Sequence, residues 1–102
     1  MKYKVKFLPS ANYDINELAD ALSEYPNKAK RIFQEMEEKI ELVKDNPKMF
    51  PVYQGNPKYR RINLEDHALF YIVSEALKEI HIYRVIYSKR DIENLLSEQS
   101  DN

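Results

Sequence analysis

The chain has 102 residues, with 16 Lys and Arg against 17 Asp and Glu, one glycine, and no cysteine or tryptophan. This length predicts one domain, which buries about 60–65% of its unfolded surface and has one modest core. A single glycine excludes glycine-rich nucleotide loops and nucleophile elbows, which need several glycines. The lack of cysteine excludes disulfides, thiolate metal sites and a cysteine nucleophile. With only His67 and His81 as histidines, the composition predicts neither a metal nor an organic cofactor.

The sequence also predicts a cytoplasmic protein without a membrane segment. Its longest apolar run, residues 69–73, is far shorter than the roughly 20 residues that cross a bilayer. Every second residue of the first six is a lysine, so this segment lacks the apolar region of a signal peptide.

The charges are unevenly distributed along the chain. Residues 1–47 are nearly neutral, residues 48–90 hold eight basic against four acidic side chains, and the tail from Asp91 is acidic. An anionic partner is therefore expected at the middle segment.

Residues 2–8 alternate basic and apolar side chains, which predicts a half-buried strand with Tyr3, Val5 and Phe7 inward. Helical spacing predicts a first helix on residues 15–22, capped by Ser10 or Asn12. A second helix, capped by Asn27, ends before Asn46-Pro47. Because Pro26-Asn27 alone separates them, the two helices should form an antiparallel hairpin.

After a loop over residues 47–58, three extended segments predict an antiparallel meander on residues 59–64, 68–73 and 79–87. Residues 91–96 form a short helix in this interpretation. The prediction is an α+β fold in which a helical hairpin covers one face of one sheet. The domain spans residues 1–96, and residues 97–102 form a frayed tail.

The last two strands are apolar on both faces. In a regular strand over residues 79–87, Ile80, Ile82, Arg84 and Ile86 share one face, and His81, Tyr83, Val85 and Tyr87 share the other. One helical hairpin covers one side. The second side must curve on itself, be capped by the final helix, or be covered by another chain, and the sequence favours another chain.

Arg84 lies among isoleucines in this pattern, so its guanidinium needs an anion. The partner is either a carboxylate such as Asp91 or Glu93, or a phosphate or carboxylate of a bound molecule. Arg60 and Arg61 point to opposite faces, and Lys89 and Arg90 follow the last strand, where side chains can meet a ligand.

Three segments in order resemble the RelE/ParE family of bacterial type II toxins. They are Tyr59-Arg60-Arg61-Ile62, then residues 69–73 (LFYIV), then residues 82–92 (IYRVIYSKRDI). The resemblance implies a RelE-like fold and a growth-inhibiting toxin whose functional face is wrapped by a cognate antitoxin. It also implies a target, which is the ribosome and its messenger RNA for RelE-like members and DNA gyrase for ParE-like members.

The resemblance also implies site residues. Cleavage of RNA by a ribose 2′-hydroxyl needs a base, an acid and cations at the phosphate. Arg61 and Arg90 match the family's basic positions, and Tyr87 or His67 could supply the proton transfers. Ala68 stands where RelE-like enzymes have arginine, and Leu95 or Leu96 stands at the aromatic acid position, so the sequence leans toward the ParE-like branch. Residues expected to bind target or antitoxin are Arg60, Arg84, Lys89, Tyr83 and Ile82.

A second interpretation is a non-enzymatic interaction module that uses the two-faced sheet to dimerise or to bind a protein. His67 is in that case a polar turn residue. The two interpretations imply a dimer or a hetero-oligomer with the antitoxin.

Overall fold

The structure is a computed structural model that describes the backbone of residues 2–100 and the side chains of residues 2–96. The elements follow the order β1 (Lys4–Phe7), α1 (Pro9–Ala21), α2 (Pro26–Asp45), β2 (Arg60–Leu64), β3 (His67–Ser74), β4 (Glu79–Tyr87) and α3 (Ile92–Ser100). The predicted α+β class and element order are confirmed. No helix among the described residues has the length and apolar content that a bilayer crossing requires.

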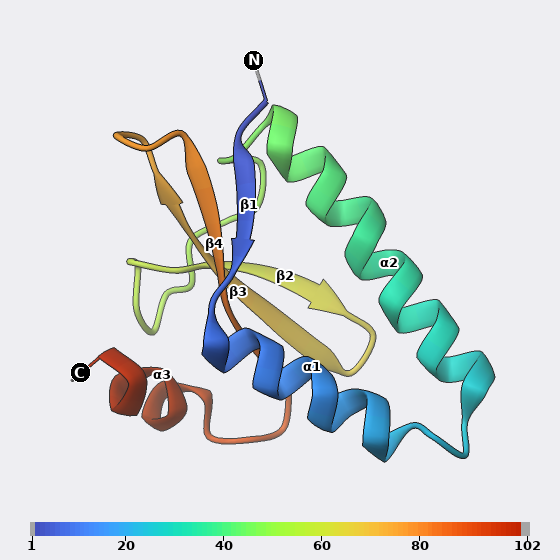
Figure 1. Ribbon diagram of the computed structural model, residues 1–102. Coiled ribbons are helices and arrows are strands. Elements are labelled where there is room, and N and C mark those ends of the chain that lie inside the picture. Colours follow the sequence, from blue (N-terminus) through green and yellow to red (C-terminus); the bar gives the residue numbers. More distant parts are fainter. Residues whose placement is uncertain (1, 101–102) are drawn as a thin grey trace.

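The sheet has the order β1-β4-β3-β2. The strands β2, β3 and β4 form the expected antiparallel meander, and β1 joins β4 in parallel. Figure 1 shows β1 beside β4, although they occupy opposite ends of the sequence. The sheet therefore has two edges, β1 on one side and β2 on the other.

The helices α1 and α2 fold back at the turn before Pro26, as expected, and then diverge, so that they form a V rather than a close pair (Figure 1). Both begin at a proline in the first turn, and no side chain caps them. The predicted caps at Ser10, Asn12 and Asn27 are wrong. The fixed φ of proline and its missing N–H suit the first helical position, so Pro9 and Pro26 start these helices.

A helix-side core joins α1 and α2 to one face of the sheet. From α2 it contains Ile32, Met36, Ile40 and Val43, and Ile62, Leu64, Leu69 and Tyr71 face them from the sheet. Tyr3 and Val5 pack against this core as predicted, whereas Phe7 is 38% exposed because it ends β1 where the chain turns into α1. Burial of each large apolar side chain contributes about 1.5–3 kcal/mol.

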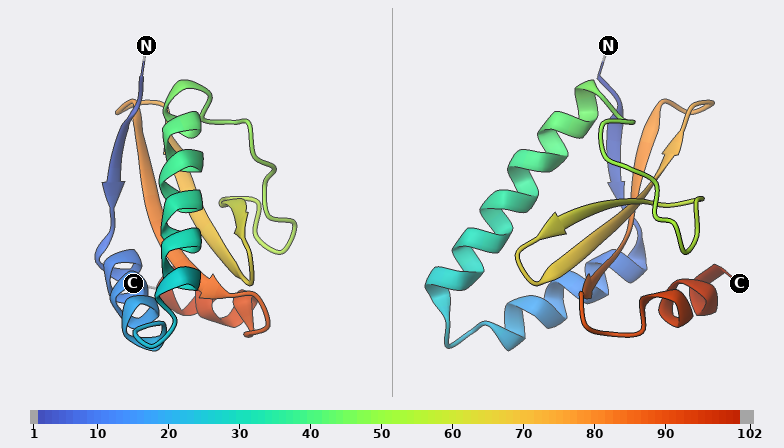
Figure 2. Two further views of the ribbon diagram at one scale, coloured as in Figure 1. Left: turned by 90° about the vertical axis from the view of Figure 1, so that its right-hand side faces the viewer. Right: turned by 180° about the vertical axis from the view of Figure 1, so that it is seen from behind.

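The opposite face has a second core, here called the α3-side core. It consists of Tyr59, Ala68, Phe70, Tyr83, Ile86, Ile92 and Leu96. Figures 1 and 2 show α3 and α2 on opposite sides of the sheet. Of the three predicted ways to cover this face, the favoured one, another chain, is wrong for these residues. Capping by the final helix is confirmed, because α3 and the loop before β2 cover them.

A β-bulge at Tyr83 changes which residues of β4 share a face. The register passes from Tyr71 opposite Ile82 to Phe70 opposite Arg84, which leaves Tyr83 as an extra residue. Ile82 and Val85 therefore both face the helix-side core, and Ile86 faces α3. The regular alternation predicted for this strand is wrong beyond Ile82. One inserted residue moves the side chains that follow it to the opposite face of the sheet from the predicted one.

The final helix is longer than the predicted 91–96 segment, since α3 runs to Ser100. The predicted frayed tail falls partly on residues 101–102, which lie outside the described residues.

Candidate functional site: a pocket between α1 and β4

The candidate site is a depression of about 380 Å³ between α1 and the end of β4, which we call the α1–β4 pocket. It brings together four of the predicted site residues, His67, Arg84, Tyr87 and Arg90. From α1 it receives Tyr13, Asp14 and Glu17.

The pocket exists because β1 accompanies β4 along only part of its length. The last bond of that pair joins the Leu8 N–H to the Ile82 carbonyl at 3.0 Å. Beyond it α1 takes the place of a strand. The Ser10 hydroxyl donates to the Tyr83 carbonyl at 2.6 Å, and the Val85 N–H donates to the Asp14 carboxylate at 2.9 Å. Ser10 and Asp14, four residues apart on α1, thus form hydrogen bonds with backbone groups of β4 that would otherwise be unpaired at the edge of the sheet.

Arg84 is held by Asp14. Its Nε and Nη2 donate to the two oxygens of Asp14 at 2.7 and 3.1 Å, and the two side chains are only 10% and 9% exposed. The predicted partners Asp91 and Glu93 are wrong, because the bulge and the path of α1 bring Asp14 to the guanidinium. The charge of Arg84 is therefore matched inside the protein.

His67 forms the opposite wall of the pocket. Its Nδ1 lies 2.9 Å from the Asp66 carboxylate, and its ring meets Tyr87 edge to face with centroids 5.5 Å apart. Tyr87 is 37% exposed, so an aromatic surface is available at the rim. These two contacts fix the orientation of the imidazole, and His67 lines the pocket.

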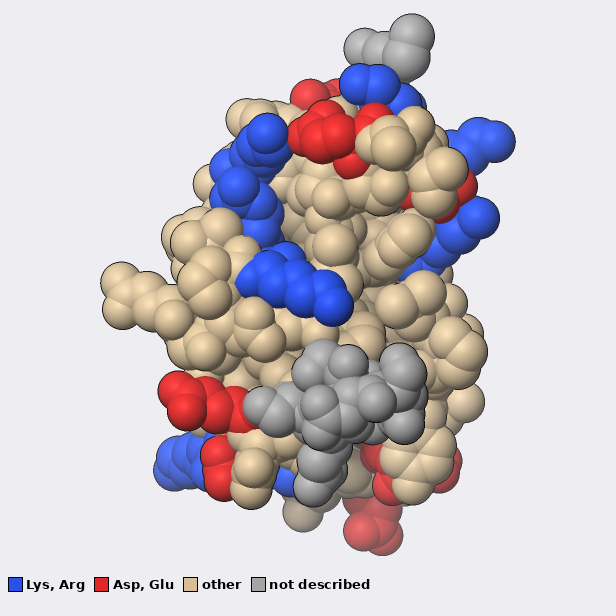
Figure 3. Space-filling view, turned by 90° about the vertical axis from the view of Figure 1, so that its left-hand side faces the viewer, with Lys and Arg blue, Asp and Glu red and all other residues tan. Residues whose placement is uncertain are grey.

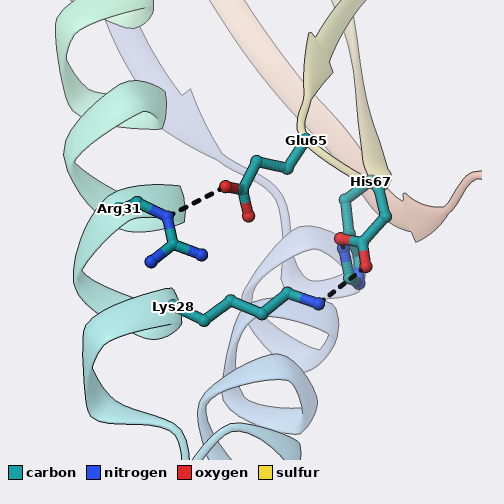
Figure 4. A network of polar contacts seen from close by, with 5 residues as sticks. Lys28, Arg31, Glu65 and His67 are labelled. Atoms are coloured by element: carbon teal, nitrogen blue, oxygen red, sulfur yellow. Dashed lines mark hydrogen bonds and ion pairs between the residues drawn. The ribbon is translucent and has the colours of Figure 1, made fainter.

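The turn that carries His67 is tied to α2, as Figure 4 shows. Lys28 donates to Asp66 at 2.8 Å, and Arg31 donates to Glu65 at 3.0 Å. The Lys28 hydrogen bond, followed by that of His67, holds the pKa of Asp66 below its usual value. Asp66 thus stays ionised and keeps its contacts to both neighbours over the ordinary pH range.

Arg60 and Arg61 lie away from this pocket. Arg60 Nη1 donates to the Phe50 carbonyl at 2.7 Å, which fixes the loop before β2. Arg61 Nε donates to the Asn63 side chain at 2.9 Å, and its guanidinium lies 5.8 Å from the Phe70 ring centroid. Arg61 lines a second depression, also of about 380 Å³, beside β2. The two arginines that the resemblance implied as catalytic, Arg61 and Arg90, therefore line different depressions.

The remaining predicted binding residues are divided between core and surface. Ile82 is 1% exposed in the helix-side core and offers no surface to a partner. Tyr83 is 8% exposed and stacks on Tyr59 with centroids 4.9 Å apart. Within the described residues its buried hydroxyl has no hydrogen-bond partner, and burial raises its pKa. Lys89 is exposed on the turn after β4.

Sequence reasoning missed the residues that α1 contributes to the pocket. Ser10 and Asp14 are spaced by one helical turn, and this spacing is a signal that the sequence does contain. The missing information is which strand they face, because Asp14 and Arg84 are 70 residues apart.

The surface seen in Figure 3 is mostly uncharged, with most of its Lys and Arg side chains in the upper half and a smaller group at the lower left. No group of three potential metal ligands occurs among the residues that the structure describes. The chemistry of the α1–β4 pocket is that of an aromatic rim from Tyr13 and Tyr87 next to one exposed arginine, Arg90. Such a surface suits the binding of a macromolecule.

The profile of the family described as "ParE toxin of type II toxin-antitoxin system, parDE" matches residues 5–92. The chain therefore belongs to the ParE toxin family of type II toxin–antitoxin systems. Among functionally curated proteins, no sequence matches this chain.

Solved structures share the fold at low sequence identity. The chromosomal ParDE system of P. aeruginosa matches with a TM-score of 0.69 and 20% identity, over 86% of this chain and 98% of the other. A mutant of the E. coli toxin RelE in the free state matches with a TM-score of 0.72 and 16% identity, over 98% of both chains. The RelE–RelB complex of Pyrococcus horikoshii matches with a TM-score of 0.58 and 21% identity, over 88% of this chain and 99% of the other.

Proposed function

We propose that this chain arrests growth in the cytoplasm by binding DNA gyrase through the α1–β4 pocket, and that a small antitoxin encoded beside it neutralises it. The family membership supports a toxin with an antitoxin partner. The observation that favours gyrase over RNA cleavage is that the cationic side chains do not converge on one point. Arg84 is bound by Asp14, and Arg61 and Arg90 line separate depressions.

Phosphate cleavage needs cations, an acid and a base around a single phosphorus atom. Two further positions argue against such a centre. Ala68, where a RelE-like arginine is expected, is fully buried beneath α3. At the position of the expected aromatic acid, Leu96 is fully buried and anchors α3, and Leu95 is partly buried against the same core. None of these three side chains carries a group that can exchange a proton or bind a phosphate.

Binding of a protein target fits the pocket better. Tyrosine and arginine are enriched among the residues that dominate protein interfaces. Tyr13 is 66% exposed and Tyr87 is 37% exposed, and both stand at the rim beside Arg90.

Ribosome-dependent RNA cleavage is the second candidate, and one observation favours it. His67, Tyr87 and Arg90 line the same pocket and together include two groups that can exchange protons and one cation. This set would form a nuclease centre without Arg61.

One pair of measurements separates the candidates. The purified chain is added to a gyrase supercoiling assay, and messenger RNA 5′ ends are mapped after induced expression. We expect loss of supercoiling and an unchanged pattern of 5′ ends. New ends within translated codons, together with normal supercoiling, would show that the second candidate is correct. If induction causes no growth arrest at all, the non-enzymatic interaction module becomes the remaining interpretation.

A further inference from the structure

His67 has one ring nitrogen that is hydrogen-bonded within the protein and one that is not. Its Nδ1 lies 2.9 Å from Asp66 Oδ1, and its Nε2 has no partner among the described residues. Within the same part of the chain, the Tyr83 hydroxyl is the only buried side-chain nitrogen or oxygen atom without a partner. The Nε2 of His67 is therefore accessible, on a side chain that lines the α1–β4 pocket.

The Asp66 carboxylate determines which nitrogen of this ring carries the proton. An ionised carboxylate only accepts hydrogen bonds, so the Nδ1 beside it must be the donor. The lowered pKa of Asp66 keeps this carboxylate ionised over the ordinary pH range. A neutral imidazole has one protonated nitrogen, so with the proton on Nδ1 the accessible Nε2 is a hydrogen-bond acceptor.

Asp66 is itself held from two sides. Lys28 Nζ, on α2, donates to Asp66 Oδ2 at 2.8 Å (Figure 4), and the Ser88 N–H, after β4, donates to the Asp66 carbonyl at 2.8 Å. Because an ammonium group has only donors, Lys28 requires an acceptor at the Oδ2 position. Lys28 is not among the residues that line the pocket. It therefore acts on the pocket only through Asp66 and His67.

We propose that Lys28 and Asp66 are positioning residues that hold His67 in its Nδ1–H tautomer, so that Nε2 accepts a hydrogen bond from an N–H or O–H group of the target in the α1–β4 pocket. The inference rests on the proposed function for the target, which is gyrase. Glu17 and Arg90 offer exposed charges at the same pocket. His67 adds a neutral acceptor on a side chain that is only 14% exposed. A target group without a hydrogen to donate leaves this acceptor unpaired, so the position discriminates between targets.

The second histidine of the chain provides an internal comparison. His81 Nε2 lies 2.9 Å from Glu79 Oε1, so the same reasoning places the proton of His81 on Nε2. Nitrogen NMR of the free wild-type chain, at a pH high enough to deprotonate both rings, distinguishes the two tautomers. We expect His67 to be protonated at Nδ1 and His81 at Nε2. Protonation of the neutral His67 ring at Nε2 would overturn the inference, whatever the target is.

A matched pair of variants separates the tautomer from the anchoring of the turn. Asp66→Asn keeps an oxygen for Lys28 and turns the amide NH₂ group toward Nδ1 of His67, which moves the ring proton to Nε2. Glu65→Gln makes the same chemical change one residue earlier, in the ion pair that ties this turn to Arg31 of α2.

We expect Asp66→Asn to reverse the His67 tautomer and to bind purified gyrase about three- to tenfold more weakly, as the loss of one hydrogen bond requires. Glu65→Gln should retain the wild-type tautomer and affinity, and thermal unfolding checks that both variants are folded. Equal losses of affinity in the two variants would show that the turn is only an anchor and would contradict the inference.

Lys28 is tested in the same binding assay. Lys28→Met removes the ammonium group and should weaken gyrase binding, whereas Lys28→Arg keeps a cationic donor to Asp66 and should restore it. Equal affinities of the Met and Arg variants would remove Lys28 from the positioning residues.

Failure of this inference and failure of the proposed function give different results. If the wild-type chain binds gyrase and folded Asp66→Asn binds it equally well, the inference is wrong and the proposed function stands. If the wild-type chain binds no gyrase, the proposed function is wrong and the target is lost with it. The tautomers of the free chain then still decide whether Asp66 positions His67.

Discussion

Asp14 and Arg84 form a two-pronged ion pair between α1 and the bulged part of β4, and the same Asp14 oxygen that receives Arg84 Nε also accepts the Val85 N–H. One carboxylate thus serves a guanidinium and the open edge of a strand. Removing it leaves a buried arginine and a backbone donor without partners.

Asp14→Ala should lower the free energy of unfolding by about 3–5 kcal/mol, the usual cost of breaking a buried pair from one side. Urea denaturation measures the change. Ser10→Ala, which removes a single hydrogen bond to the same strand, is the comparison and should cost about 1 kcal/mol. Similar losses in both variants would mean that Arg84 finds another anion.

Two buried tyrosines should respond oppositely to loss of their hydroxyl groups. Tyr71 donates to the Pro47 carbonyl at 2.8 Å, so Tyr71→Phe should destabilise the protein by about 1 kcal/mol. Tyr83 has no partner for its hydroxyl among the described residues, so Tyr83→Phe should be neutral or stabilising. Urea denaturation at neutral pH compares the two variants, and destabilisation by Tyr83→Phe would reveal a hydrogen bond to that hydroxyl.

The same tyrosine gives a prediction at alkaline pH. Burial raises the pKa of Tyr71 to about 12, from about 10 in the unfolded chain. The folded state then holds the phenolic proton more tightly, so this contribution is fully present below pH 10 and is lost as pH rises toward 12. Between pH 9 and pH 11 wild-type stability should fall more steeply than that of Tyr71→Phe. Parallel curves would show that the phenol does not ionise on unfolding.

The turn before β3 is strained. Glu65 adopts a φ of 53°, a left-handed conformation that costs a residue with a Cβ about 1 kcal/mol. Glu65→Gly removes this cost and also an exposed ion pair with Arg31, which contributes little. We expect a net stabilisation of about 0.5 kcal/mol, and the same for Lys78→Gly at the turn before β4, where φ is 55°. Thermal unfolding measures both variants, and a melting temperature of either variant below that of the wild type would contradict the expectation.

Arg90→Ala should relieve growth arrest with little change in stability, because surface substitutions usually change it by about 0.5 kcal/mol or less. Its side chain is exposed and lines the α1–β4 pocket. Lys30→Ala removes an exposed cation from α2 and should retain the arrest. Growth after induction, with circular dichroism to confirm folding, measures both. Arrest that persists in a folded Arg90→Ala variant would remove this pocket from the mechanism.

The sequence was sufficient for the element order and for the antiparallel meander, because alternation and helical spacing are local signals. It also placed His67, Tyr87 and Arg90 among the site residues, and these share one pocket. The side of Ile86 and the partner of Arg84 were not predictable in this way. The alternation of apolar and polar residues does not reveal where a strand has a bulge. Asp14 contacts Arg84 only because the folded chain places α1 beside the end of β4. The starts at Pro9 and Pro26 can be predicted from the preference of proline for the first helical turn, but the expected caps at Ser10, Asn12 and Asn27 placed both starts further along the chain.

The parallel pairing of β1 with β4 determines when the fold can be completed. Residues 4–7 cannot pair in the sheet until residues 79–82 are present, and Asp14 cannot form its hydrogen bonds until residues 84 and 85 are present. Closing so long a loop is entropically expensive and comes late in folding. The α1–β4 pocket is assembled from both ends of this loop, so a growing chain has no finished pocket until Arg90 has been made. On the proposed function, which places growth arrest in this pocket, the chain cannot act before β4 has been made, and neutralisation by the antitoxin is needed only from that point.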